Sequence, residues 1–142
     1  MWKQWPIFGW VYNDALIGSL SSDQKNGSRS IRLQNGYVET IFRVENMEEI
    51  SFNFGNFSQN TPSANLTINI SEDDVNWYTI DTLASTSSFE VYSIDITDTL
   101  LNTFGLSKTD GLYIRLSSND SKRINIDDFS IVCLGETIFN VD

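Results

Sequence analysis

Apolar and polar residues alternate with a period of two along most of the chain, and this pattern is typical of β-strands with one buried face. A sustained apolar stripe of helical period is missing from the sequence. The alternating segments are short, and Asn, Gly, Asp and Ser separate them at intervals of roughly 8–12 residues. The expected strands cover residues 30–34, 37–44, 50–54, 65–70, 77–81, 89–96, 112–116 and 123–132, and one short helical turn is expected near residues 98–106.

The turns and the polar strand faces point to an all-β fold. Asn35-Gly36 separates the first two segments, and this dipeptide is the strongest short-range signal for a hairpin. Parallel strands would be almost continuously apolar and joined by helices, whereas these strands keep a polar face. The sequence therefore predicts an antiparallel β-sandwich of two sheets. The sandwich forms a single domain over residues 1–142, with residues 1–8 as an aromatic N-terminal extension.

The strand expected at residues 123–132 contains a break in its alternation. Apolar residues occupy even positions up to Ile126 and odd positions from Phe129 onward. A change of parity requires an extra residue, so we expect a β-bulge at or near Asp127-Asp128. Two adjacent carboxylates repel each other unless something neutralises them. Either a hard cation such as calcium binds there, or one carboxylate points to solvent and the other accepts hydrogen bonds from loop N–H groups.

Composition and charge exclude several classes of function. The 142 residues contain no His and a single Cys, which excludes His-based catalytic triads, an internal disulfide and clusters of Cys ligands. The net charge of −10 disfavours nucleic acids and anionic membranes as partners. No segment approaches the ~20 apolar residues of a membrane span, and neither a dinucleotide-binding glycine motif nor a phosphate-binding loop is present. We therefore expect a protein that is not an enzyme and does not insert into membranes.

If the apolar residues of each strand face the core, the residues of opposite parity form an exposed sheet face. This face carries amides, guanidinium groups and tyrosines, which are the groups that bind a polyhydroxylated ligand. Tyr113 and Arg115 share one strand, and Asn125 is expected on a neighbouring strand. The predicted ligand-binding residues are Tyr113, Arg115, Asn125, Arg32 and Asn53. The alternative is an ordinary solvated outer sheet.

Aromatic residues stand out at two further places. Trp77 follows the acidic turn Glu72-Asp73-Asp74 and begins a strand, so we expect it to pack over the edge of the sandwich. Truncation of such a residue to Ala costs about 3–5 kcal/mol. The N-terminal segment contains Trp2 and Trp5, whose rings can stack on sugars, contact another chain or pack against the end of the sandwich.

Three stretches of the sequence resemble a jelly-roll module of bacterial extracellular proteins. The opening stretch consists of Asn26-Gly27-Ser28-Arg29-Ser30-Ile31-Arg32-Leu33, Gly36-Tyr37-Val38-Glu39-Thr40 and Ile50-Ser51-Phe52-Asn53-Phe54-Gly55. The other two are the segment 66–77, with its acidic turn and Trp77, and the closing strand at residues 123–131. Such modules accompany secreted nucleases and surface proteins, and they are related in shape to carbohydrate-binding modules and MAM-like adhesion domains. The resemblance covers residues 9–132 and implies a jelly-roll fold. It also implies a structural calcium ion near the first and closing strands, with Asp128 a better ligand than Asp127.

These observations predict a non-catalytic module that binds carbohydrate or mediates adhesion at a cell surface. Its expected partner is a polysaccharide or other glycan, and its expected cofactor is structural calcium. Because the N-terminus lacks the pattern of a signal peptide, we expect export as part of a larger protein, or release by lysis in a phage tail or baseplate. The alternative is a structural or protein-interaction domain that contacts a parent protein or neighbouring subunit through its Trp-rich N-terminus.

Overall fold

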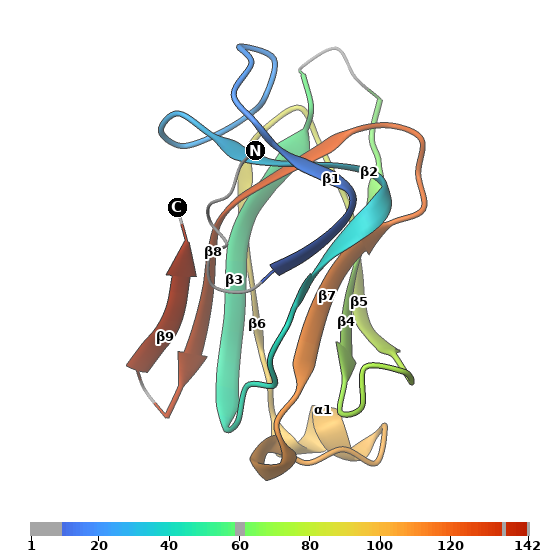
Figure 1. The fold of residues 1–142 in the computed structure, drawn as a ribbon, viewed down its shortest axis with the longest axis vertical. Helices are drawn as coiled ribbons and strands as arrows, with labels where there is room; N and C mark the ends of the chain where they lie inside the picture. The colour runs from blue at the N-terminus through green and yellow to red at the C-terminus, as the bar shows by residue number, and fades with distance from the viewer. Residues whose placement is uncertain (1–9, 59–61, 135, 142) are drawn as a thin grey trace.

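Antiparallel β-strands make up most of the computed structural model, which describes residues 10–58, 62–134 and 136–141 (Figure 1). The strands are β1 (Trp10–Gly18), β2 (Ser30–Thr40), β3 (Met47–Asn56), β4 (Asn65–Ser71), β5 (Tyr78–Ala84), β6 (Glu90–Asp95), β7 (Tyr113–Ser118), β8 (Ile124–Cys133) and β9 (Glu136–Val141). A short helix, α1 (Asp98–Asn102), and a 3-10 helix (Lys108–Asp110) connect β6 to β7. The predicted all-β fold and its short helical turn are confirmed. Among the residues described, no helix has the length and apolar character needed to cross a membrane.

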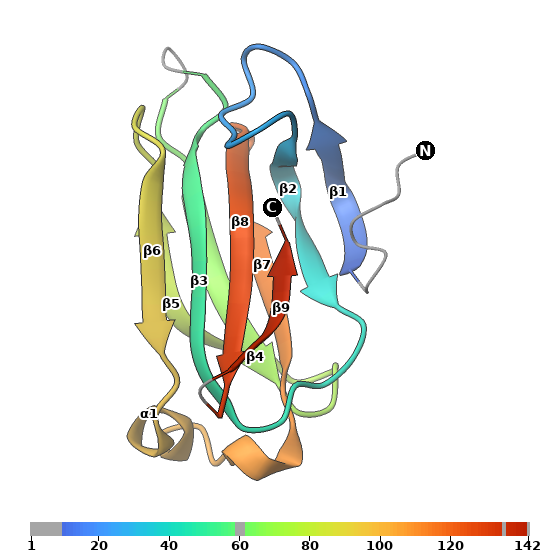
Figure 2. The same cartoon turned by 90° about the vertical axis from the view of Figure 1, so that its left-hand side faces the viewer.

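β2 joins the two layers of the sandwich. Its first half, around Ile31–Leu33, pairs with β8, and its second half, Gly36–Glu39, pairs with β7. Hydrogen-bonded neighbours therefore run in the order β5-β4-β7-β2-β8-β3-β6, with β1 added along β2 and β9 along β8. Figure 2 shows β6, β3 and β8 in one layer and β5, β4 and β7 in the layer behind it. The sandwich is thus one continuous sheet that folds over at β2.

Asn35-Gly36 lies inside β2, so the predicted hairpin at this dipeptide is wrong. Asn35 has a φ of 48° and lies opposite a bulge in β1 at Asp14, whose φ is 49°. A Cβ atom on Gly36 would lie 2.0 Å from the carbonyl oxygen of Asn13, so the close approach of the two strands requires glycine. The dipeptide bends β2 where its partner changes from β8 to β7, and the chain does not reverse there.

The hydrophobic core fills the space between the layers and follows the predicted alternation. Its buried side chains include Ile31, Leu33, Val38, Phe52, Phe54, Leu66, Ile68, Ile70, Leu112, Ile114, Leu116, Ile124 and Ile126. Phe42, also expected in the core, is half-buried and packs against it. Trp10 is buried and meets Phe129 edge to face, with ring centroids 4.8 Å apart. Trp2 and Trp5 lie outside the described residues.

The bulge predicted at Asp127-Asp128 is confirmed. Ser51 of β3 pairs with Ser130 of β8, whereas Asn53 pairs with Asp127, so β8 has an extra residue between these two pairs. Asp128 takes a φ of 53°, in the left-handed region that a bulge often requires. Because of the extra residue, the alternation can change parity while the apolar residues on both sides of it stay in the core.

Candidate functional site

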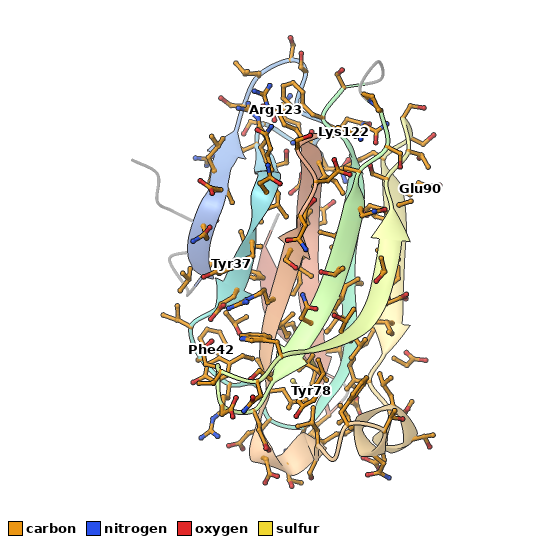
Figure 3. All side chains as sticks on the ribbon, turned by 90° about the vertical axis from the view of Figure 1, so that its right-hand side faces the viewer. Tyr37, Phe42, Tyr78, Glu90, Lys122 and Arg123 are labelled. Carbon is orange, nitrogen blue, oxygen red and sulfur yellow. The ribbon has the colours of Figure 1, made fainter. Side chains whose placement is uncertain are left out.

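The candidate site lies on the outer face of β5, β4, β7 and the second half of β2, which Figure 3 shows with Tyr37 on it. Alternation along β7 buries Ile114 and leaves Tyr113 and Arg115 half-buried on the outer side. The strand register places Arg115 beside Glu39 of β2 and beside Asn69 of β4. Three strands therefore bring their polar side chains together around Arg115.

Arg115 lies against two aromatic rings. Its Cζ atom is 4.0 Å from the centroid of the Tyr37 ring and 4.1 Å from that of the Trp77 ring. Its Nε and Nη2 atoms both donate to Oε1 of Glu39, at 2.8 and 2.6 Å. Cation–π attraction and the ion pair together fix the guanidinium group. We call Tyr37, Glu39, Trp77 and Arg115 the aromatic–arginine cluster.

Glu39 is the buried member of this cluster, with 6% of its surface exposed. Burial raises the pKa of Glu39, and a hydrogen bond with Asp74 raises it further, while Arg115 acts in the opposite direction. The carboxyl group of Glu39 is therefore shared between a cation and a second acid. This arrangement leaves the aromatic rings and the hydroxyl groups of the face, more than its acids, to contact a ligand.

The turn before β5 positions both Asp74 and Trp77. The Oδ1 atom of Asp73 accepts hydrogen bonds from the backbone N–H groups of Asn76 at 2.8 Å and Val75 at 2.9 Å. These bonds, the one from Asn76 foremost, hold the pKa of Asp73 below its ordinary range. Asp73 therefore stays ionised at neutral pH and fixes the turn that leads into Trp77.

Small polar side chains extend along β4 and β7 from the cluster. The amide nitrogen of Asn69 donates to Thr67 Oγ1 at 3.1 Å and to Ser117 Oγ at 3.0 Å. The amide oxygen of Asn69 accepts a hydrogen bond of 2.7 Å from Thr79 Oγ1. We call Thr67, Asn69, Thr79 and Ser117 the polar floor. Asn69 is buried, and its bonds orient the hydroxyl groups of the half-buried Thr67 and Ser117 and of the exposed Thr79 on the outer face.

Of the five predicted ligand residues, the structure brings two, Tyr113 and Arg115, together on this face. Asn125 lies on β8, whose neighbours are β2, β3 and β9, so the prediction that its strand lies beside β7 is wrong. Asn125 is also fully buried, which contradicts its expected exposure. Its amide accepts from the Gln24 N–H at 2.9 Å and donates to Asp23 Oδ1 at 2.9 Å. Asn125 thus holds the loop between β1 and β2.

Arg32 and Asn53 also lie outside the candidate face, in the layer that contains β8 and β3. Arg32 contacts the β1–β2 loop, and Asn53 contacts the bulge in β8. Arg32 pairs with Asp23 through bonds of 2.6 and 2.9 Å, and their side chains are 16% and 0% exposed. Burial alone would raise the pKa of Asp23, but hydrogen bonds from Arg32 and Asn125 outweigh it and lower the pKa. Asn53 donates to Asp128 Oδ2 at 2.9 Å. A direct role of Arg32 or Asn53 in ligand binding stays a prediction.

The two carboxylates of the bulge accept hydrogen bonds from N–H donors. Asp127 is fully buried, and its oxygens accept from the backbone N–H groups of Asp128 at 2.8 Å and Asn26 at 2.7 Å. Asp128 accepts from the side-chain amides of Asn26 and Asn53. Within the described ranges, no group of three or more His, Cys, Asp or Glu side chains is placed to hold a metal ion. Both carboxylates therefore already have N–H donors in the folded protein, and calcium binding at Asp127 or Asp128 stays a prediction.

Calcium binding at Asp128 stays a prediction, and thermal melting tests it. Calcium that binds only the folded protein stabilises it, by about 2.7 kcal/mol at roughly a hundredfold excess over Kd. Each protein is melted once with calcium and once with chelator. We expect calcium to raise the Tm of the wild type above its value in chelator, and to leave the Tm of Asp128→Asn unchanged. Equal midpoints with calcium and chelator in both proteins would exclude this site.

Trp77 differs from its expected position. It directly precedes the edge strand β5, but it is half-buried beside Arg115 and is not part of the hydrophobic core formed by the described residues, so its expected contribution to the core is wrong. Tyr37 and Glu39 have the outward parity that the alternation predicts, yet the sequence does not single them out as ligand residues. The contact of Trp77 with Arg115 reaches across β4, which pairs with β5 and β7, and only the strand order reveals it.

Solved structures of several binding modules have a similar fold. The CBM22-1 xylan-binding domain of Xyn10C from Paenibacillus barcinonensis has a TM-score of 0.62 and 13% identity, over 89% of this chain and 86% of that chain. The K1 cleaved adhesin domain of Lys-gingipain from Porphyromonas gingivalis W83 has a TM-score of 0.66 and 13% identity, over 89% and 91%. CBM35 from Paenibacillus barcinonensis has a TM-score of 0.56 and 15% identity, over 88% and 93%. No family model and no curated protein sequence matches the chain. The resemblance to jelly-roll modules is confirmed at the level of the fold.

Proposed function

We propose that this chain is a non-catalytic carbohydrate-binding or adhesion module whose ligand lies on the outer face of β5, β4, β7 and the second half of β2. The aromatic–arginine cluster beside the polar floor carries this proposal. Sugar rings have apolar faces that pack on aromatic side chains, and their hydroxyl groups pair with guanidinium, amide and hydroxyl groups. The cluster supplies the first kind of contact, and the polar floor supplies the second.

The similar folds support the same class of function. One of them is a xylan-binding domain and another is an adhesin domain. We propose that the module acts outside the cell or at a cell surface, as part of a larger secreted protein or of a virion. The acids around the site support binding more than catalysis, because Glu39 is paired with Arg115 and Asp73 is bonded to N–H groups of its own turn.

Replacing Trp77 by Ala is expected to weaken glycan binding by about tenfold, equivalent to 1.4 kcal/mol. The same change should cost only about 0.5–1 kcal/mol of folding stability, because Trp77 contacts Arg115 and lies outside the core. The measurement is a glycan array followed by affinity electrophoresis in a panel of soluble polysaccharides that includes xylan. Urea unfolding of the same samples gives the stability.

Phe89→Ala is the matched control, because Phe89 is also half-buried but lies near the β1–β2 loop. It should leave glycan binding unchanged. Equal binding by wild type and Trp77→Ala would contradict the assignment of the site. An empty array, combined with a concentration-dependent shift in sedimentation, would instead favour the alternative of a structural or protein-interaction domain.

A further inference from the structure

A polar pocket lies at the end of the same outer face, away from Trp77. Its volume is about 470 Å³, and it is lined by Asn35, Asn65, Thr67, Thr82, Asn119, Asp120 and Ser121. We call it the asparagine pocket. Figure 3 shows Lys122, the residue that follows Ser121, at the upper end of this face. Amide, hydroxyl and carboxylate groups from four segments therefore converge at one place.

The loop that forms one wall of this pocket is held in place by its own hydrogen bonds. The backbone N–H of Asn35 donates to the carbonyl oxygen of Asp120 at 3.0 Å. With its amide nitrogen turned toward the loop, the Asn35 side chain also donates to the carbonyl oxygens of Asn119 at 3.0 Å and Asp120 at 3.2 Å. The Asp120 carboxylate accepts from the Lys122 N–H at 3.1 Å, and this bond lowers the pKa of Asp120. The wall is therefore organised before any ligand arrives.

The asparagine pocket and the aromatic–arginine cluster are connected by the polar floor. Thr67 belongs to both the pocket and the floor. Asn69, which pairs with Arg115, lies four residues along β4 from Asn65, and a strand of that length spans about 13 Å. The two places thus mark the ends of one polar track that runs parallel to β4 and β7.

We propose that the asparagine pocket is a second contact point for the ligand of the aromatic–arginine cluster, and that this ligand is an unbranched, uncharged polysaccharide chain lying along β4 and β7. This inference rests on the proposed function. A chain of sugar units is the form of carbohydrate that can reach both ends of the track at once. Acidic chains are disfavoured because Glu39, Asp74 and Asp120 border the track and the protein carries a net charge of −10.

Affinity is expected to increase with chain length until both contact points are occupied. The probes are xylo-, cello-, manno- and laminari-oligosaccharides, each from disaccharide to hexasaccharide, measured by calorimetry. A hexasaccharide that fits should bind the wild type about tenfold or more tightly than its disaccharide, because the second contact is made within the same complex. The double variant Thr82→Ala/Asn119→Ala, which changes two exposed side chains of the pocket, should bind the disaccharide like the wild type and lose the gain with length.

The control double variant is Thr99→Ala/Asn102→Ala, which removes the same two residue types from the exposed surface of α1. It should keep the full gain with chain length. Binding that does not depend on length, or a pocket variant that weakens short and long chains equally, would overturn the inference and leave the proposed function intact. Binding only to branched or acidic glycans on the array would also overturn the inference and leave the proposed function intact. The absence of any glycan binding would instead remove the proposed function itself.

Discussion

Replacing Asp23 by Asn is expected to lower the free energy of unfolding by about 3–5 kcal/mol, because the change leaves the half-buried charge of Arg32 without its counterion. The Asp23 side chain is 0% exposed and that of Arg32 is 16% exposed. Asp23 also accepts hydrogen bonds from Asn125 Nδ2 at 2.9 Å and from the Leu20 N–H at 2.9 Å. One carboxylate therefore ties the β1–β2 loop to β2 and to β8.

The pH dependence of stability gives this prediction a second measurement. The pKa of Asp23 is lower in the folded protein than its ordinary value of 3.8. The unfolded chain therefore takes up a proton at Asp23 before the folded protein does as the pH falls. The stabilisation by Asp23 is present above its ordinary pKa and is lost as the pH falls through the lower, folded value. The difference in stability between wild type and Asp23→Asn should accordingly shrink below about pH 4.

The control for this change is Asp98→Asn, an acid-to-amide substitution at the exposed first turn of α1. It should change the free energy of unfolding by less than about 1 kcal/mol. Urea unfolding at neutral and acidic pH measures the free energy of unfolding of the wild type, Asp23→Asn and Asp98→Asn. A loss below about 1 kcal/mol in Asp23→Asn at neutral pH would show that the loop is held by its other hydrogen bonds. Glycan binding should survive in folded Asp23→Asn, because Asp23 lies on the other layer.

The sequence predicts the fold well because period-two alternation directly reports which side of a strand is buried. Two strands, β1 and β9, are not predicted from the sequence. In β1 the bulge at Asp14 interrupts the alternation, and β9 is short and contains adjacent apolar residues, Ile138 and Phe139. Asn35-Gly36 misleads for a related reason. Glycine and a left-handed asparagine suit a tight turn, but they equally suit a strand that bends between layers and approaches its neighbour closely.

The candidate site is harder to predict, because alternation gives the face of each strand but not the order of the strands. Arg115 and Asn125 have the same outward parity, yet β7 and β8 lie in different layers, and the β1–β2 loop bonds to Asn125. Trp77 precedes β5, so its contact with Arg115 depends on both β5 and β7 pairing with β4. Residue types indicate the chemistry of the site. The positions of its members come from pairing between segments far apart in the sequence.

The bulge at Asp128 leads to the other prediction with a large effect, since it places Phe129 in the core. Phe129 is 0% exposed, lies edge to face with Trp10 and stacks on Phe52 at a centroid distance of 6.3 Å. Replacing Phe129 by Ala is expected to cost about 3–5 kcal/mol, because it removes a fully buried ring and leaves a cavity between the layers. Urea unfolding measures the loss.

Ser130→Ala is the matched control, because Ser130 follows Phe129 on β8 and has the opposite parity. Its side chain is half-buried on the outer face, so the change should stay within about 0.5 kcal/mol of the wild type. Phe129→Leu should lie between the two, because leucine refills part of the cavity. If the parity of β8 did not change at Asp128, Phe129 would face outward, and Phe129→Ala would then cost little more than Ser130→Ala. The order of the three losses therefore tests the bulge itself as well as the packing of one ring.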